Sequence, residues 1–132
     1  MRDFYDLSAA NDRIVELRPL LEALRADRDT VAETQRRLEQ LRQPGGNGAS
    51  SSELDERRQQ MGKTIKRMEA AVRRIDAWGI ALRDIDTGLV DFPALVNGRP
   101  IWLCWKLGEG DIAWWHDLEA GIAGRRAIIE ME

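Results

Sequence analysis

The chain has 132 residues, enough for one domain with a modest hydrophobic core. Its 20 basic and 23 acidic side chains nearly balance, so charge gives no general argument for binding nucleic acid or a membrane surface. A single cysteine excludes an internal disulfide, and no segment resembles a signal peptide or a membrane span. We therefore expect a cytoplasmic protein, and the strong preference for Arg over Lys is typical of a GC-rich bacterial genome.

Two long helices are predicted before any strand. From Ser8, which can serve as an N-cap, apolar residues recur at alternating steps of three and four as far as Leu38. Residues 43–52 are rich in Gly and Ser and predict a flexible linker. A second heptad pattern runs from Leu54 to a predicted helix end near Gly79. Two such helices joined by a loop predict an antiparallel coiled-coil hairpin.

The apolar stripe of the hairpin is wider than a pair of helices needs. Leu20 and Leu41 lie off the main seam of the first helix. Leu38 and Met61 lie too far along the arm to reach a sheet packed at its base. We therefore predict a homodimer in which two hairpins form a four-helix arrangement. The alternative is a monomer with a solvated arm tip.

A short antiparallel sheet is predicted after the helices. Asn97-Gly98 is a strong signal for a two-residue hairpin, because both residues tolerate the positive φ angles of a type I′ turn. Pairing outward from this turn places Asp91 opposite Cys104 and gives the strands one wholly apolar face. That face consists of Val90, Phe92, Ala94, Ile101, Leu103 and Trp105.

A second tight turn is predicted at Glu109-Gly110. It would place Trp114 and His116 on the apolar face that packs against the helices. Trp102 and Trp115 would then lie on the opposite face, as an exposed apolar patch of the kind that marks a partner surface, unless the C-terminal segment covers them. The fold class is therefore α+β in a single domain. Its parts are a helical hairpin over 8–79, a β-meander of three to four antiparallel strands over 80–117, and a C-terminal segment over 118–132, in which 127–129 could add an edge strand.

Several blocks of the sequence resemble a known family. Arg83-Asp84-Ile85-Asp86-Thr87-Gly88-Leu89-Val90-Asp91-Phe92-Pro93 is followed by Leu103-Cys104-Trp105-Lys106-Leu107-Gly108-Glu109 and by Trp115-His116-Asp117. In this order the blocks resemble a bacterial family known as domain of unknown function 2203. The resemblance covers nearly the whole chain and supports the domain boundaries, but it implies no reaction.

The strongest chemical constellation is the predicted cross-strand pair of Asp91 and Cys104. Asp, Cys and His are metal-ligand types, and zinc or iron could use this pair with Glu109 or Asp117. The predicted register sends His116 to the opposite face, so a metal shared with it would require a bulge. The structural alternatives are a small buried cysteine and a carboxylate bonded to a lysine, an indole or a loop amide.

Other motifs carry weaker signals. Asp86-Thr87-Gly88 is the tripeptide of aspartic proteases, but here it is better explained as a turn between two strands. Cys104 with His116 as its base could form a nucleophilic pair, although a lone histidine at a strand end is more often a bonded structural group. Arg125-Arg126 could hold phosphate, but the acidic balance of this half argues against nucleic acid.

These observations favour a non-enzymatic protein-interaction or regulatory module. The alternative is a metal- or small-ligand-binding protein, possibly an enzyme, that uses Asp91, Cys104, Glu109 and His116. Nothing in the sequence requires a cofactor, and no membrane partner is indicated. The candidate ligand or partner surface comprises Asp91, Trp102, Cys104, Glu109, Trp115 and His116, of which Asp91, Cys104 and His116 are the candidate metal ligands.

Overall fold

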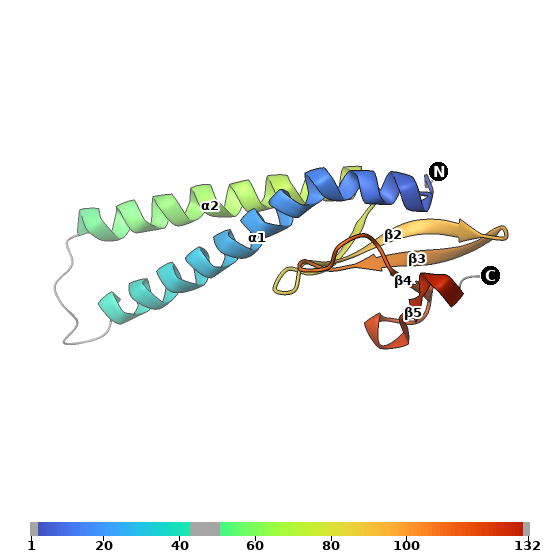
Figure 1. The fold of residues 1–132 in the computed structure, drawn as a ribbon. Helices are drawn as coiled ribbons and strands as arrows, with labels where there is room; N and C mark the ends of the chain where they lie inside the picture. Colours follow the sequence, from blue (N-terminus) through green and yellow to red (C-terminus); the bar gives the residue numbers. More distant parts are fainter. Residues whose placement is uncertain (1–2, 43–50, 131–132) are drawn as a thin grey trace.

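A computed structural model describes residues 3–42 and 51–130, and it contains the expected helical hairpin (Figure 1). Helix α1 (Leu7–Arg42) and helix α2 (Ser51–Ala77) lie antiparallel, with their bases against the sheet. The prediction that Ser8 is the N-cap is wrong. The N-cap is Asp6, two residues earlier, whose Oδ1 accepts a hydrogen bond from the backbone N–H of Ala9 at 2.7 Å. Most of the predicted linker, residues 43–50, lies outside the described residues.

The sheet has five antiparallel strands in sequence order, rather than the three to four that were predicted. Each strand is hydrogen-bonded to the next one along the chain. The Asp86-Thr87-Gly88 segment is a turn between the first two strands, as predicted. The strands are β1 (Ala81–Asp84), β2 (Leu89–Val96), β3 (Arg99–Trp105), β4 (Trp114–Asp117) and β5 (Arg126–Ala127).

The predicted register of β2 and β3 is confirmed, including Asp91 opposite Cys104. Asn97 has a φ of 51° and Gly98 one of 77°, as a type I′ hairpin turn requires. The predicted register of β3 and β4 is wrong by one residue, because Trp102 pairs with His116. This slip sends every side chain of β4 to the face opposite the predicted one.

A loop replaces the predicted tight turn at Glu109-Gly110. The indole Nε1 of Trp105 donates to the Gly110 carbonyl at 2.8 Å, and the Ile112 backbone N–H donates to Asn11 Oδ1 at 2.8 Å. These bonds tie residues 106–113 to β3 and to α1, so β4 begins only at Trp114. Glu109 and Gly110 therefore belong to a longer loop between β3 and β4 and do not form a two-residue turn.

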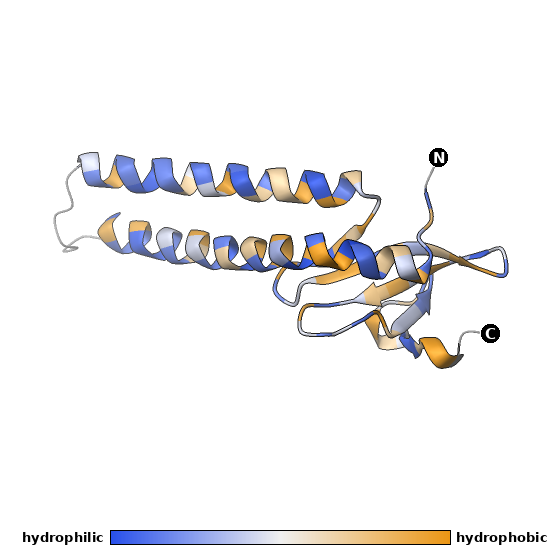
Figure 2. Ribbon diagram, turned by 45° about the horizontal axis from the view of Figure 1, so that its top comes forward, coloured by the Kyte–Doolittle hydropathy of each residue, from blue (hydrophilic) through white to orange (hydrophobic). Residues whose placement is uncertain are grey.

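The hydrophobic core lies between the sheet and the bases of the two helices. Both helices are mostly hydrophilic, with hydrophobic positions recurring along them (Figure 2). Trp115 is 3% exposed and belongs to this core, whereas Trp114 lies on the other face and is only partly buried, the reverse of the prediction. The buried core comprises Ala10, Ile14, Leu17, Leu21, Leu24, Ile75, Ile80, Val90, Phe92, Ala94, Ile101, Leu103, Trp105, Ile112 and Trp115.

The predicted exposed patch of Trp102 and Trp115 does not form, because Trp115 lies in the core and Trp102 is covered on the second sheet face. Trp102 is 8% exposed, and the Arg83 guanidinium lies 4.9 Å from the centre of its ring. The chain after β4 turns back over this face, and β5 then adds an edge strand beside β4. Neither long helix of the described residues is apolar enough to span a membrane.

Candidate functional site

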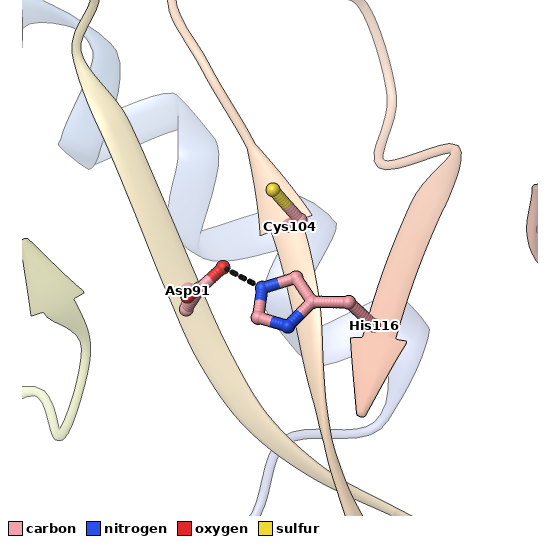
Figure 3. A group of neighbouring side chains, drawn as sticks. All are labelled: Asp91, Cys104 and His116. Carbon is pink, nitrogen blue, oxygen red and sulfur yellow. Dashed lines mark hydrogen bonds and ion pairs between the residues drawn. The ribbon is translucent and has the colours of Figure 1, made fainter. Parts of the chain in front are cut away.

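Three buried side chains of metal-ligand type meet on the second sheet face. Asp91 comes from β2, Cys104 from β3 and His116 from β4, and all three project away from the helices (Figure 3). One ligand-type atom from each residue lies within 4.8 Å of the other two. The one-residue difference in β4 register is what brings His116 to Asp91 and Cys104 without a bulge.

The hydrogen-bond partners of His116 indicate that its ring nitrogen Nδ1 carries a proton. Nδ1 lies 2.9 Å from the backbone carbonyl of Asp117, and a carbonyl oxygen can only accept, so we infer that Nδ1 is the donor. Nε2 lies 2.9 Å from Asp91 Oδ1. A carboxylate oxygen and a nitrogen lone pair are both acceptors, so a proton on Nε2 or another cation must lie between the two atoms.

The other carboxylate oxygen of Asp91 is bonded to an arginine that sequence reasoning missed. Arg83 Nε donates to Asp91 Oδ2 at 2.9 Å, and the Asp91 side chain is only 4% exposed. The sequence analysis instead considered a lysine, an indole or a loop amide as the partner of this carboxylate. The sequence carries no signal for this pair, because a register shift between Leu82 and Asp84 is what places Ala81 opposite Asp91 and Arg83 on the same face.

Cys104 holds its proton strongly. Burial, and secondly the nearby Asp91 carboxylate, raise the pKa of the thiol to about 11. The imidazole Nε2 is directed to Asp91 and does not bond to the thiol. The geometry therefore gives no support to Cys104 and His116 as a nucleophilic pair at neutral pH.

Glu109 and Asp117 lie outside the cluster. Glu109 Oε1 accepts bonds from Arg125 Nη2 at 2.8 Å and from the Lys106 backbone N–H at 2.9 Å. Burial would raise the pKa of Glu109, but these bonds outweigh burial and lower it. The Asp117 side chain is 44% exposed and lies 3.6 Å from Arg99, so this residue serves the cluster only through its backbone carbonyl.

The family model described as "Uncharacterized conserved protein (DUF2203)" matches residues 3–128 of this chain. The chain belongs to the DUF2203 family. This match confirms the family resemblance found in the sequence and includes the whole sheet with the Asp91, Cys104 and His116 cluster. No curated protein and no solved structure matches the chain significantly. The bacterial origin stays a prediction.

In this DUF2203 protein a cavity of about 360 Å³ lies beside the cluster. Its walls come from β1, β2, β3 and β4 and from the chain that follows β4. Polar, charged and apolar side chains therefore all contribute to its lining. The lining residues are Arg83, Leu89, Asp91, Cys104, His116, Leu118, Glu119, Ala120, Gly121 and Ile122.

Proposed function

We propose that this protein binds a divalent transition metal ion through Asp91, Cys104 and His116, with Zn²⁺ as the best fit. The observation that carries the proposal is the convergence of three buried ligand-type atoms within 4.8 Å of one another, with His116 Nε2 and Asp91 Oδ1 2.9 Å apart. A metal ion is one cation that would satisfy them together. The buried Cys104 beside them supplies the third ligand type.

The donor set is suited to zinc. Zn²⁺ accepts thiolate, imidazole and carboxylate ligands at about 2.0–2.3 Å, which places neighbouring ligand atoms of a tetrahedral site roughly 3.3–3.7 Å apart. The ligand-type atoms of the cluster span 2.9 Å between Asp91 and His116 and at most 4.8 Å overall. Small side-chain adjustments would bring them to zinc distances. Iron remains the second candidate ion.

The surroundings of the cluster support ligation. The Asp117 carbonyl orients the imidazole through Nδ1, and Arg83 orients the carboxylate through Oδ2. Metal-binding histidines and carboxylates are generally held by such second hydrogen bonds. One thiolate and one carboxylate would neutralise a divalent ion in this buried site, and the Arg83 guanidinium would leave one positive charge beside it.

Native mass spectrometry with elemental analysis tests the proposal on protein that has been stripped of metal and then incubated with Zn²⁺. We expect one zinc per chain. Asp91→Asn, Cys104→Ser and His116→Gln should each weaken binding at least tenfold, because each removes a ligand. Asp117→Asn is the matched control, since it changes the neighbouring carboxylate and keeps the backbone carbonyl that holds His116.

Two results would contradict this proposal. The first is wild-type protein that retains no zinc although its melting curve shows it to be folded. The second is an Asp117→Asn variant that loses zinc as completely as the ligand variants do. Melting curves of every variant separate a lost ligand from a lost fold.

A second candidate role, self-association through the hairpin, rests on a different observation. Val31, Ile65, Met68 and Val72, with Glu69 and Arg73, line a largely apolar groove between the two helices, on the half of α2 nearer the sheet. Ile65 is 36% exposed and Val72 is 38% exposed. Apolar side chains left in water at heptad positions favour packing against a second copy of the same hairpin.

A further inference from the structure

We propose that the cavity beside the cluster binds a small aliphatic monocarboxylate, whose oxygen completes the coordination of the metal ion. This inference rests on the proposed metal site and extends it from an ion-binding site to a ligand-binding site. Three features of the cavity carry it: the coordination position that three protein ligands would leave open, the arginine in its lining and the apolar residues that also line it.

The coordination position follows from the number of protein ligands. A structural zinc site is closed by four protein ligands, whereas three leave a position for water or another ligand. Among the described residues, only Asp91, Cys104 and His116 form a group that could hold a metal ion. All three also line the cavity, so the remaining position of a bound ion would be directed toward it.

Arg83 provides the recognition of negative charge. Its Nε is bonded to Asp91, and within the described part of the chain no hydrogen bond engages its two Nη groups. The guanidinium is held over the Trp102 ring, and its side chain is 45% exposed while also lining the cavity. A guanidinium in this position can donate to a carboxylate that also reaches the metal ion.

The other residues that line the cavity determine which ligand charge and which ligand side chain it favours. Glu119 also lines the cavity, so a dianion such as sulfate would meet a like charge that a monoanion meets less strongly. Leu89, Leu118 and Ile122 provide an apolar surface for a short alkyl chain. The volume of about 360 Å³ is near the lower end of the usual range for small-molecule sites, about 300–1,000 Å³, which favours a small ligand.

Cobalt substitution gives a direct test, because visible absorption of Co²⁺ reports changes in its ligands. Protein saturated with Co²⁺ is titrated with butyrate, acetate and sulfate. We expect butyrate to change the spectrum saturably, acetate to bind more weakly, and sulfate to have little effect. Arg83→Gln should weaken butyrate binding about tenfold, in line with the loss of one charge-assisted hydrogen bond. Arg126→Gln is the control, because Arg126 does not line the cavity.

The outcomes separate this inference from the proposed function. A thiolate-bound cobalt spectrum that butyrate leaves unchanged overturns the ligand site and leaves the metal site standing. Equal responses to sulfate and butyrate, or equal losses in the Arg83 and Arg126 variants, also overturn the ligand site. Absence of any cobalt spectrum overturns both proposals. The Co²⁺ affinity of Arg83→Gln is measured separately, so that weaker butyrate binding is not confused with weaker metal binding.

Discussion

At the level of single residues, the position of one proton determines what His116 can do. The Asp117 carbonyl accepts a hydrogen bond from Nδ1, so Nε2 faces Asp91 either with a proton of its own or across a bound cation. Asp91 is held in turn by Arg83. The same imidazole without the backbone carbonyl could donate to Asp91 from Nε2, and the carboxylate and imidazole would then satisfy each other without a cation.

The raised pKa of Cys104 predicts a loss of stability at alkaline pH in metal-free protein. The thiol ionises at its ordinary value of 9.0 when the chain is unfolded, but at about 11 when it is folded. Its contribution is therefore present below pH 9 and is lost as the pH rises through 11. The size is roughly 2–3 kcal/mol for a shift of this extent.

Denaturant unfolding at a series of pH values, compared with Cys104→Ala, measures this contribution. The two stability curves should run parallel below pH 9 and converge or cross above it, because the variant has no thiol to ionise. Parallel curves over the whole range from pH 8 to 11 would show that burial of Cys104 does not perturb the thiol.

The sequence correctly predicted that Asp91 and Cys104 are neighbours, but it placed His116 on the wrong face of the sheet. The first pair follows from the Asn97-Gly98 turn, whose geometry leaves a single register. The position of His116 depends on where β4 begins. That is decided by two tertiary hydrogen bonds, from Trp105 to the Gly110 carbonyl and from the Ile112 N–H to Asn11. No local pattern around Glu109-Gly110 contains that information.

At the level of elements, the C-terminal segment is held over the second sheet face by a partly buried ion pair. Arg125 Nη2 bonds to Glu109 Oε1 at 2.8 Å, and the two side chains are only 13% and 20% exposed. The arginine also lies 5.0 Å from the centre of the Trp114 ring. Arg125, which the sequence analysis considered for phosphate binding, is thus engaged within the fold.

Replacing Arg125 with Met should loosen this segment. The variant leaves the Glu109 carboxylate without its partner, and the segment also loses the cation–π contact with Trp114. We expect hydrogen exchange at the Ile128 amide, which bonds to the Ala113 carbonyl, to accelerate about tenfold at neutral pH, in line with the loss of one charge-assisted hydrogen bond. Arg126→Met is the control, because Arg126 is exposed and its guanidinium lies 5.4 Å from the centre of the Trp115 ring, away from Glu109.

The pH dependence of this effect has a defined sign. The pKa of Glu109 lies below its ordinary value of 4.5, so its contribution is present above that pH and is lost as the pH falls below it. The difference between Arg125→Met and the wild type should therefore shrink in acid. An Arg126→Met variant that exchanges as fast as Arg125→Met would contradict the role of the ion pair.

At the level of the whole molecule, the hairpin has two different halves. Near the sheet, α1 buries Ile14, Leu17, Leu21 and Leu24 completely. Toward the tip, the buried residues of the described helices reduce to Leu38 and Thr64. The arrangement of two heptad helices was predictable from the sequence, because their period is local. Any cover for the distal half would have to come from assembly with another chain.

Sedimentation equilibrium tests self-association over a range of protein concentrations. We expect the wild type to show about twice the chain mass of 15.0 kDa, and Ile65→Glu to shift it to the monomer, because a charge would be placed in the apolar groove. Val15→Glu is the matched control, since Val15 is 72% exposed and lies outside the groove. A wild-type monomer at all concentrations would exclude the dimer.

Asp91, Cys104 and His116 come from three successive strands and are separated by thirteen and twelve positions in the chain. An ion held by all three would act as a removable cross-link that closes two short loops of the unfolded chain, much as a pair of disulfides does. The entropy lost by the unfolded chain would stabilise the sheet together with the helix bases that share its core. Metal supply would then raise the temperature at which this half of the molecule melts.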